Sequence, residues 1–415
     1  MHQVIAAFGL LVMIGLAWLM SSDRSRFPFR VVAGGLFLQV SFALLILRTR
    51  TGQALFEYLG AFFTGLLDFV DVGSQFVFGD NFGEHYFAFK VLPTIIFFSA
   101  LMSVLYHLGV MQFVVRILGV IMQKTLGTSG AESLSAAANI FVGQTEAPLV
   151  IRPYLPGMTR SEMMAVMVGG FSTVAGGVMA AYVGMKINAA HLMTASVISA
   201  PAALVLAKVM QPETGTPETL GVTKHELPRQ TANLIEAVSV GASDGLKLAL
   251  NVGAMLIAFL GLIRMIDFGM EHTSIWLSQL LGFADAAPWT LSRLCGVLFS
   301  PFAWLIGIEW SDCQAAGELL GLKMVSNEFV AYQNLSEWIA NPDSGKTMTP
   351  RSIVIITYAL CGFSNFASIG IQVGGIGGIV PERRTELTQL GLRAMLGGTL
   401  ACLMTACVAG IVMPD

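Results

Sequence analysis

The stretch FVGQTEAPLVIRPYLPG, from Phe141 to Gly157, places an acidic residue between two apolar runs. Each run is too short to cross a bilayer, because a spanning helix needs roughly 20 consecutive apolar residues. Such a segment can enter and leave on one face as a re-entrant hairpin, provided that its tip is buried in protein or lines a wet cavity. We therefore predict a re-entrant hairpin whose acidic residue, Glu146, has a functional role.

The composition around this stretch is that of a membrane protein. The chain is 55% hydrophobic and 12% charged, which is about half of the roughly 25% charge content of soluble domains. Val4 to Met20, Val31 to Leu47 and Ala394 to Met413 are charge-free over nearly the length of a membrane helix. The fold class predicted is an all-α polytopic membrane protein.

The composition also excludes several kinds of function. The net charge of −3 gives no reason to expect a nucleic acid partner, so the expected partners are lipid and small solutes. The five cysteines have no CxxC or metal-ligand spacing, which argues against a disulfide framework and a zinc site. No catalytic triad pattern is found, and we expect neither an enzyme nor a resident cofactor.

Eight membrane crossings fit the hydropathy pattern. Five of them follow the two N-terminal stretches, at 86–107, 161–183, 190–209, 246–263 and 353–379, and the last lies at the C-terminus. Interfacial helices are predicted at 53–84, 111–124 and 268–288.

Basic residues set the predicted orientation. Arg24, Arg26 and Arg30 place the first loop inside, so both termini lie outside, and the basic PERR at 381–384 falls on the inner side as well. Met1-His2-Gln3 lacks the basic start of a signal peptide, so we expect the first helix to be retained. The predicted location is the bacterial inner membrane.

Three motifs recur in the same order in the two halves of the chain. Each half has a glutamate in an interrupted apolar stretch, then a Thr/Arg/Ser helix start, then a span broken by GFS and a polar residue, GFST at 170–173 and GFSN at 362–365. Since the first copy enters from inside and the second from outside, we predict an inverted repeat, as in many secondary transporters.

The predicted organisation follows from this repeat. Residues 1–110 and 211–290 form the scaffold, with a polar linker at 211–230, and residues 111–210 and 291–415 form the two repeats of a transport domain. Each repeat would contain one hairpin and one broken helix.

The chemistry is concentrated at the hairpin tips and the helix breaks. Glu146 and Glu328 occupy matched places, although each could instead only accept hydrogen bonds from nearby backbone N–H groups. Gln144 and Thr145 add an amide and a hydroxyl, which suit a neutral solute rich in donors and acceptors. Phe171 and Phe363, at the two breaks, could stack on a ring or simply pack.

The glycine-rich breaks free backbone carbonyls that suit a hard cation. Asn139, just before the first tip, and Thr173, in the first break, are the natural side-chain oxygen donors for Na⁺. Ordinary hydrogen bonding between helices is the alternative role for both.

At GQTEAPLVIRP, LLGLKMVSNEFVAY and CGFSNFASIGIQVGGIGG the chain resembles the concentrative nucleoside transporter family, from about Ile95 to the C-terminus. The resemblance implies a bacterial importer driven by Na⁺ or H⁺, with eight membrane helices and two re-entrant hairpins. It also implies a homotrimer in which a scaffold holds a moving transport domain.

The resemblance also implies a binding site. The base would contact four residues: Gln144, Thr145, Glu146 and Val178. The ribose would bind Glu328, Asn365 and Ser368, with Phe363 lining the pocket. Na⁺ would be held by the Asn139 and Thr173 side chains and the Val142 and Val174 carbonyls. The family often has serine or threonine at the position of Thr173, so this residue leaves sodium coupling open and does not prove it. A channel and an intramembrane enzyme with paired carboxylates remain alternatives from other functional classes.

Overall fold

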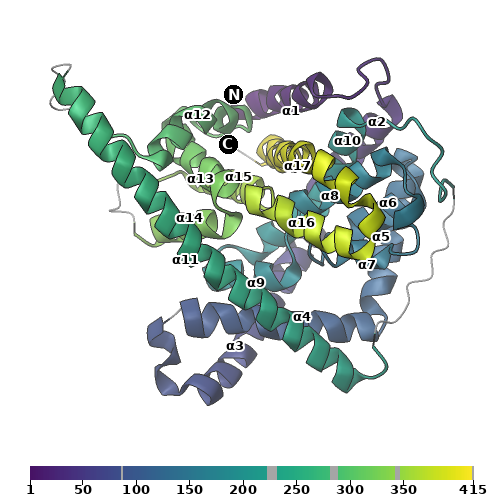
Figure 1. Cartoon of the computed structure of the whole chain (residues 1–415), viewed down its shortest axis with the longest axis horizontal. Coiled ribbons are helices and arrows are strands. Elements are labelled where there is room, and N and C mark those ends of the chain that lie inside the picture. Colours follow the sequence, from purple (N-terminus) through teal and green to yellow (C-terminus); the bar gives the residue numbers. More distant parts are fainter. Residues whose placement is uncertain (86, 222–230, 281–287, 342–345, 414–415) are drawn as a thin grey trace.

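The computed structural model describes residues 1–85, 87–221, 231–280, 288–341 and 346–413, and all regular elements in these ranges are helices. The two ends of the chain lie next to each other, because the Gln3 side-chain amide donates to the Met413 carbonyl at 2.8 Å (Figure 1). A chain whose two ends lie on one face crosses a membrane an even number of times.

The helices follow in chain order, with short 3₁₀ and π turns between some of them. They are α1 (His2–Leu19), α2 (Phe29–Leu47), α3 (Arg50–Phe78), α4 (Leu92–His107), α5 (Val110–Leu126), α6 (Gly130–Ala138), α7 (Ala147–Val150), α8 (Arg160–Ser172), α9 (Gly176–Gly184), α10 (Ala189–Met210), α11 (Leu234–Leu280), α12 (Leu291–Leu305), α13 (Cys313–Val325), α14 (Glu328–Ala340), α15 (Pro350–Leu360), α16 (Phe366–Ile379) and α17 (Arg384–Val412).

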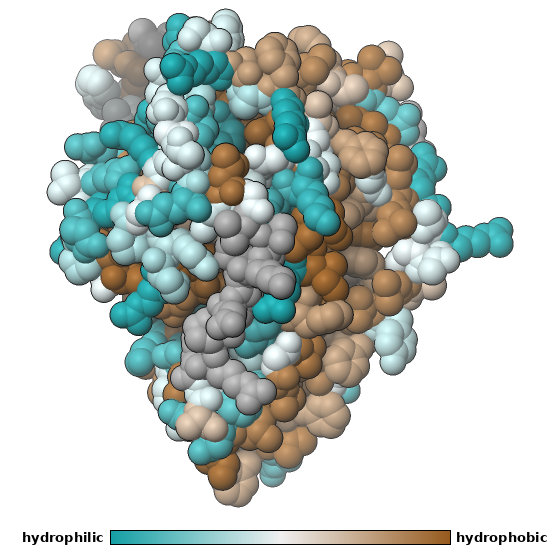
Figure 2. Space-filling model, turned by 90° about the vertical axis from the view of Figure 1, so that its right-hand side faces the viewer, coloured by the Kyte–Doolittle hydropathy of each residue, from teal (hydrophilic) through white to brown (hydrophobic). Residues whose placement is uncertain are grey.

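Seven helical segments of the described chain are long and apolar enough to cross a membrane. They are His2–Leu19, Phe29–Leu47, Phe87–His107, Arg160–Gly184, Ala189–Met210, Leu234–Leu280 and Pro381–Val412. Figure 2 shows the apolar residues gathered over a broad area of one face. The predicted all-helical, multi-pass class is confirmed. The count of eight stays a prediction, because the remaining region, 353–379, forms the two shorter helices α15 and α16.

The membrane helices divide into an inner and an outer group. The apolar window within Arg160–Gly184 is wholly buried, and those of α10 and α17 are 89% and 83% buried. The corresponding window of α11 is only 17% buried, so this helix lies on the outside of the bundle. The inner group contains one of the two broken helices, which places its break in the protein interior.

The region after the linker differs from the sequence expectation. We expected a span at 246–263 and a separate surface helix at 268–288, but α11 runs unbroken over 47 residues across the molecule (Figure 1). At 1.5 Å per residue it is about 70 Å long, well over the hydrocarbon thickness of roughly 30 Å. The stretch IRMIDF at 263–268 contains neither proline nor glycine, so nothing in it ends the helix. Residues 281–287 lie outside the described residues.

Small residues bring α11 close to α4. A Cβ added to Gly241 would lie 2.7 Å from the Ala100 Cα, and one added to Gly245 would lie 2.7 Å from the Ile96 Cα. Helices approach this closely in membranes where small side chains line the contact. α4 and α11 therefore form one closely packed pair.

The N-termini of α6 and α8 are held together by their caps. Ser129 and Glu132 form a capping box on α6, and Thr159 and Glu162 form one on α8. The Ser129 hydroxyl also donates to Glu162 Oε1 at 2.6 Å, and Lys208 Nζ of α10 lies 2.7 Å from Glu132 Oε2. Both partners of this ion pair are almost completely buried.

The first part of the polar linker is hydrogen-bonded to the N-terminus of α6. The Thr219 carbonyl accepts from the Gly130 N–H at 3.0 Å, and its hydroxyl oxygen accepts from the Ala131 N–H at 3.0 Å. These bonds satisfy the first N–H groups of α6, which have no partner within the helix. The rest of the predicted linker, 222–230, lies outside the described residues.

Candidate functional site

Two interrupted helices meet at their interruptions. α8 and α9 are separated by 173–175, where Thr173 is extended, and α15 and α16 are separated by 361–365. The Phe363 N–H donates to the Thr173 carbonyl at 3.3 Å, which joins the two breaks. Gly362 allows this approach, because a Cβ there would lie 2.8 Å from the Phe171 carbonyl oxygen. The breaks therefore cross in the interior with backbone groups available to ligands.

Two further helix interruptions lie at the segments that the sequence predicts as hairpin tips. In the first, 139–146 separates α6 from α7, and the Gly176 N–H of α9 donates to the Phe141 carbonyl at 3.0 Å. In the second, Ser326 and Asn327 separate α13 from α14. The Asn327 side-chain oxygen caps α14 by accepting from the Val330 N–H at 2.9 Å. The first tip thus lies against α9, the second part of the first broken helix.

Glu328, at the second tip, is fixed by two side chains from two different helices. Its Oε1 accepts from the Tyr182 hydroxyl of α9 at 3.0 Å, and its Oε2 accepts from the Asn365 amide at 3.0 Å. Asn365 in turn caps α16, because its side-chain oxygen accepts from the Ser368 N–H at 2.9 Å. Glu328 is only 4% exposed, so a buried polar cluster is built around it.

Gln144, at the first tip, joins the same cluster. Its side-chain amide donates to the Ser368 hydroxyl at 3.2 Å, and its oxygen accepts from the Gln372 amide at 3.1 Å. Gln372 also donates to the Met167 carbonyl of α8 at 3.1 Å. The hydrogen bonds therefore run continuously from α9 through the second tip and α16 to the first tip and α8. We call the six side chains of this chain the polar network: Tyr182, Glu328, Asn365, Ser368, Gln144 and Gln372.

Tyr182 and Gln372 were not among the predicted site residues. Tyr182 stands four residues after Val178 on α9, and Gln372 stands four residues after Ser368 on α16. Helical residues four apart lie on one face, so this spacing is the signal that could have identified both. Val178 itself is buried, at 2% exposed.

Glu146 faces a different direction from Gln144. Its Oε2 accepts from its own tip, at the Gly143 N–H, and its side chain is exposed. Within the described part of the chain, the hydrogen bonds of Glu146 and those of Glu328 have no residue in common. The neighbouring Thr145 packs on α16, where a Cβ on Gly375 would lie 2.6 Å from the Thr145 Cγ2.

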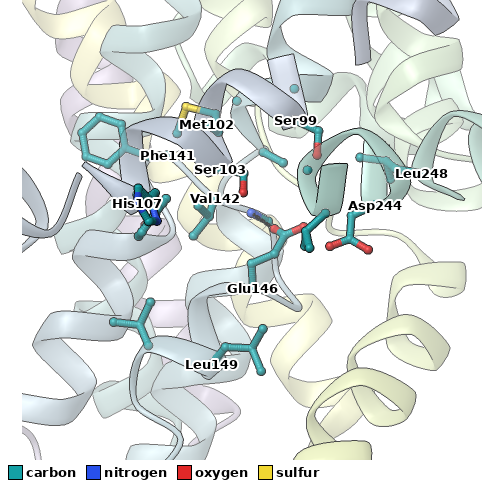
Figure 3. Close-up of a pocket in the computed structure, with 18 of the residues that line it drawn as sticks. Ser99, Met102, Ser103, His107, Phe141, Val142, Glu146, Leu149, Asp244 and Leu248 are labelled. Atoms are coloured by element: carbon teal, nitrogen blue, oxygen red, sulfur yellow. Dashed lines mark hydrogen bonds between the residues drawn. The ribbon is translucent and has the colours of Figure 1, made fainter. Parts of the chain in front are cut away.

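Glu146 lines a cavity of about 220 Å³ between the first tip and the α4/α11 pair. Figure 3 shows the Glu146 side chain reaching into this cavity toward Asp244 of α11. Hydroxyl groups of Ser99, Ser103 and Tyr106, from α4, line the same space, and His107 at its rim lies 2.7 Å from the Thr231 hydroxyl. The cavity thus has polar groups on both of its walls.

Two of the four predicted cation ligands, Asn139 and Thr173, lie beside Gly169. The Thr173 hydroxyl donates to the Gly169 carbonyl at 3.0 Å, and a Cβ on Gly169 would lie 3.0 Å from the Asn139 amide nitrogen. The Asn139 side-chain oxygen is buried and has no hydrogen-bond partner among the described residues. Val142 and Val174 lie outside helices, at the tip and in the break. An unpartnered buried oxygen beside freed carbonyls fits a hard monovalent cation.

The aromatic residues of the two breaks differ in burial. Phe171 is completely buried, and Phe363 is partly buried against the core. The packing role of Phe171 is therefore supported, whereas Phe363 keeps a free face.

The sequence matches three family descriptions. Residues 191–410 match the Na⁺ dependent nucleoside transporter C-terminus, residues 8–81 match its N-terminus, and residues 88–187 match the nucleoside recognition Gate. Together these regions cover most of the chain.

Curated relatives extend this likeness. Solute carrier family 28 member 3 of Homo sapiens is 42% identical over 99% of this chain, which spans 60% of that relative's length. Sodium/nucleoside cotransporter 1 of Rattus norvegicus is also 42% identical, and the chain spans 64% of it. A transporter of Haemophilus influenzae is 44% identical, with 99% of this chain and 98% of the relative covered.

Solved structures match the fold over nearly the whole chain. The transporter CNTnw in an inward-facing, substrate-bound state has a TM-score of 0.91 and 40% identity, covering 99% of this chain and 98% of that one. A doubly substituted CNTnw in an outward-facing state has a TM-score of 0.90, with the same identity and coverage.

Proposed function

Since the chain belongs to the Na⁺ dependent nucleoside transporter family, we propose that it is a secondary active importer that carries nucleosides by Na⁺ symport. The observation that carries this proposal is the polar network. Its carboxylate, amides and hydroxyls are buried, close together, and supplied by both tips and both broken helices. Such groups match a ligand that is neutral and rich in hydroxyl and amide groups.

The two ends of the network suit the two parts of a nucleoside. Glu328, Asn365 and Ser368 offer a carboxylate, an amide and a hydroxyl to the ribose hydroxyls, with Phe363 beside them. The base contacts proposed are Gln144, Thr145, Glu146 and Val178: Gln144 would reach the base from the network, and Glu146 from the separate cavity that its side chain lines. Glu328 and Asn365 bond to each other, and nucleoside hydroxyls would exchange with this bond at little net cost.

Na⁺ would bind where the first tip meets the first break. The Asn139 and Thr173 side-chain oxygens and the Val142 and Val174 carbonyls are its proposed ligands. A cation there would tie 139–146 to the α8/α9 break, and this would fix Gln144 of the same tip in its binding position. Sodium binding would thereby raise nucleoside affinity, which is the coupling that symport requires.

The transport movement proposed is of the elevator type. Residues 111–210 and 291–415 would move as the transport domain against a scaffold made of 1–110 and 211–290. The close α4/α11 packing supports a rigid scaffold wall, and the cavity lies between that wall and the first tip. CNTnw is described in outward-facing, intermediate and inward-facing states, which is the range of states that such a movement needs.

The membrane arrangement proposed has eight crossings, two re-entrant hairpins and an inverted repeat in the bacterial inner membrane, with both termini outside. The adjacent chain ends support an even number of crossings. Corresponding caps support the repeat: Asp312, before α13, accepts from the Thr349 N–H of α15 at 3.0 Å, as Ser129 of α6 bonds Glu162 of α8 in the first half. The homotrimer proposed rests on the resemblance of the motifs.

The decisive test is uptake into liposomes that contain the purified protein. Radiolabelled uridine should accumulate above its external concentration when a Na⁺ gradient points inward, and accumulation should collapse when the gradient is removed. Uptake that is indifferent to Na⁺ at neutral and acidic pH alike would contradict any cation coupling. A panel of purine and pyrimidine nucleosides as competitors then defines the base preference.

The principal alternative is proton symport at the same site. Uptake that needs only an inward pH gradient, with Na⁺ absent, would support it, with Glu146 or Glu328 as the titrating group. A solute channel is the second alternative. It would equilibrate uridine without accumulation and would show no counterflow.

A further inference from the structure

A buried lysine lies beside the second break, whereas the predicted cation ligands at the first break are neutral oxygens. Lys323 of α13 is 2% exposed, and its ammonium donates to the Ala359 carbonyl at 2.8 Å, next to the end of α15. Lys323, Ala359 and Ser364 line a cavity of about 10 Å³. The Ser364 hydroxyl, in the break, is buried and has no hydrogen-bond partner among the described residues.

The place of Lys323 corresponds to that of the proposed Na⁺ ligands in the first half. Gly169 and Ala359 each stand ten residues after the threonine that caps their helix, Thr159 and Thr349. In the first half, Asn139 from the hairpin helix lies against Gly169. In the second half, Lys323 from the hairpin helix bonds Ala359. The predicted hairpin and the broken helix thus meet at neutral oxygens in the first half and at an ammonium group in the second half.

The charge of this lysine needs an explanation of its own. Placing a charged group within a membrane helix bundle is energetically unfavourable, and more so when the group has no charged partner. In the described chain no carboxylate lies within 4 Å of the Lys323 ammonium. A neutral donor would hold one carbonyl at a lower cost. The carbonyl groups at the C-terminal end of a helix, and those left without a helical partner at a break, attract a cation. That cation can be a bound ion or a charged side chain of the protein.

We propose that Lys323 is the built-in cation of the second half, in the position that corresponds to the Na⁺ site of the first. This inference rests on the proposed function and deepens it. Lys323 lies five residues before Glu328, and Ala359 lies six residues before Asn365. The ammonium therefore holds the two segments that carry the ribose-binding pair, at any Na⁺ concentration. Only the first half, with the base-binding Gln144, responds to Na⁺.

The experiment is a titration of Na⁺ against uridine binding to purified protein, measured by calorimetry. In the unsubstituted protein, uridine binding should depend hyperbolically on Na⁺ concentration, because only the first half of the chain binds the ion. Lys323→Met should weaken uridine binding by roughly tenfold or more at saturating Na⁺, which is within the usual range of coupling between sites. Lys323→Asn, which offers an oxygen ligand in place of the charge, should make the Na⁺ response sigmoidal. Lys323→Arg should stay hyperbolic.

Lys346→Met is the matched control. Lys346 belongs to the same half and pairs with Glu318 away from the break, with its side chain 40% exposed, so its loss should leave the Na⁺ response unchanged. Lys323→Met and Lys323→Asn variants with parental uridine affinity and a parental Na⁺ response would overturn the proposal. If Lys323→Met does not fold, the unsubstituted protein provides the test. A sigmoidal dependence of its uridine binding on Na⁺ concentration would overturn the proposal. A parent that binds no nucleoside would overturn the proposed function as well, which separates the two failures.

Discussion

The side-chain amide of Gln144 donates to the hydroxyl of Ser368 at 3.2 Å, although the two residues are 224 positions apart in the sequence. This bond connects the first tip to the helix that follows the second break. Through Asn365, which caps that helix, it reaches Glu328 at the second tip. A movement at one tip therefore changes the geometry of groups supplied by the other half of the chain.

The carboxylate of Glu328 should dominate ribose binding. Glu328→Gln keeps the shape of the side chain but removes its charge and one acceptor. Since hydrogen bonds to charged groups contribute about 1.5–3 kcal/mol, uridine affinity should fall roughly 10- to 150-fold. Calorimetry at saturating Na⁺ measures this directly, with thermal unfolding as a check on the fold. Parental affinity would remove Glu328 from the site.

Tyr182 should act through Glu328 rather than by itself. Tyr182→Phe removes only the hydroxyl that bonds Glu328 Oε1, so uridine affinity should fall by about 1 kcal/mol, roughly fivefold. In Glu328→Gln the same change should have a smaller effect, because residues in one hydrogen-bond network are not additive. A double-mutant cycle on uridine affinity tests this, and full additivity would show that Tyr182 acts independently.

Loss of an oxygen ligand in the first half of the chain should weaken Na⁺ binding more than it weakens uridine binding at saturating Na⁺. Thr173→Val keeps the shape of the side chain and removes its oxygen, so the Na⁺ concentration for half-maximal uridine binding should rise roughly tenfold or more, for the loss of about 1.4 kcal/mol. Uridine affinity extrapolated to saturating Na⁺ should stay close to that of the parent. Thr64→Val, a similar change at a threonine whose hydroxyl donates to the Gly60 carbonyl within α3, is the control. An unchanged Na⁺ requirement in Thr173→Val would exclude this residue as a ligand.

The buried ion pair between Lys208 and Glu132 should matter for stability. Lys208→Met leaves the Glu132 carboxylate buried without its counter-ion, and breaking such a pair typically costs about 3–5 kcal/mol. The melting temperature of the detergent-purified protein should fall clearly. Adding Glu132→Gln should recover part of the loss, because the uncompensated charge is then gone. Equal melting temperatures for parent and Lys208→Met would show that the pair contributes nothing.

The helix interruptions illustrate what local sequence can predict. GFST and GFSN place a helix end at Ser172 and a helix start at Phe366, because glycine and small polar residues offer the backbone alternatives to helical bonds. The helix start after Thr159 is equally local, since a threonine followed three residues later by glutamate forms a capping box. By contrast, the sequence predicted a span at 246–263 and a separate surface helix at 268–288, where the structure has the single helix α11.

By itself, the sequence determined the membrane class, the two interrupted helices and the candidate residues at the tips, because hydropathy, caps and breaks depend on neighbours within a few positions. Only the tertiary structure decided that Gln144 and Glu328 belong to one network with Tyr182 and Gln372, while Glu146 lines a separate cavity opposite Asp244. Which way a side chain at a tip points is set by the packing of helices more than 100 residues away, and no local pattern encodes that packing.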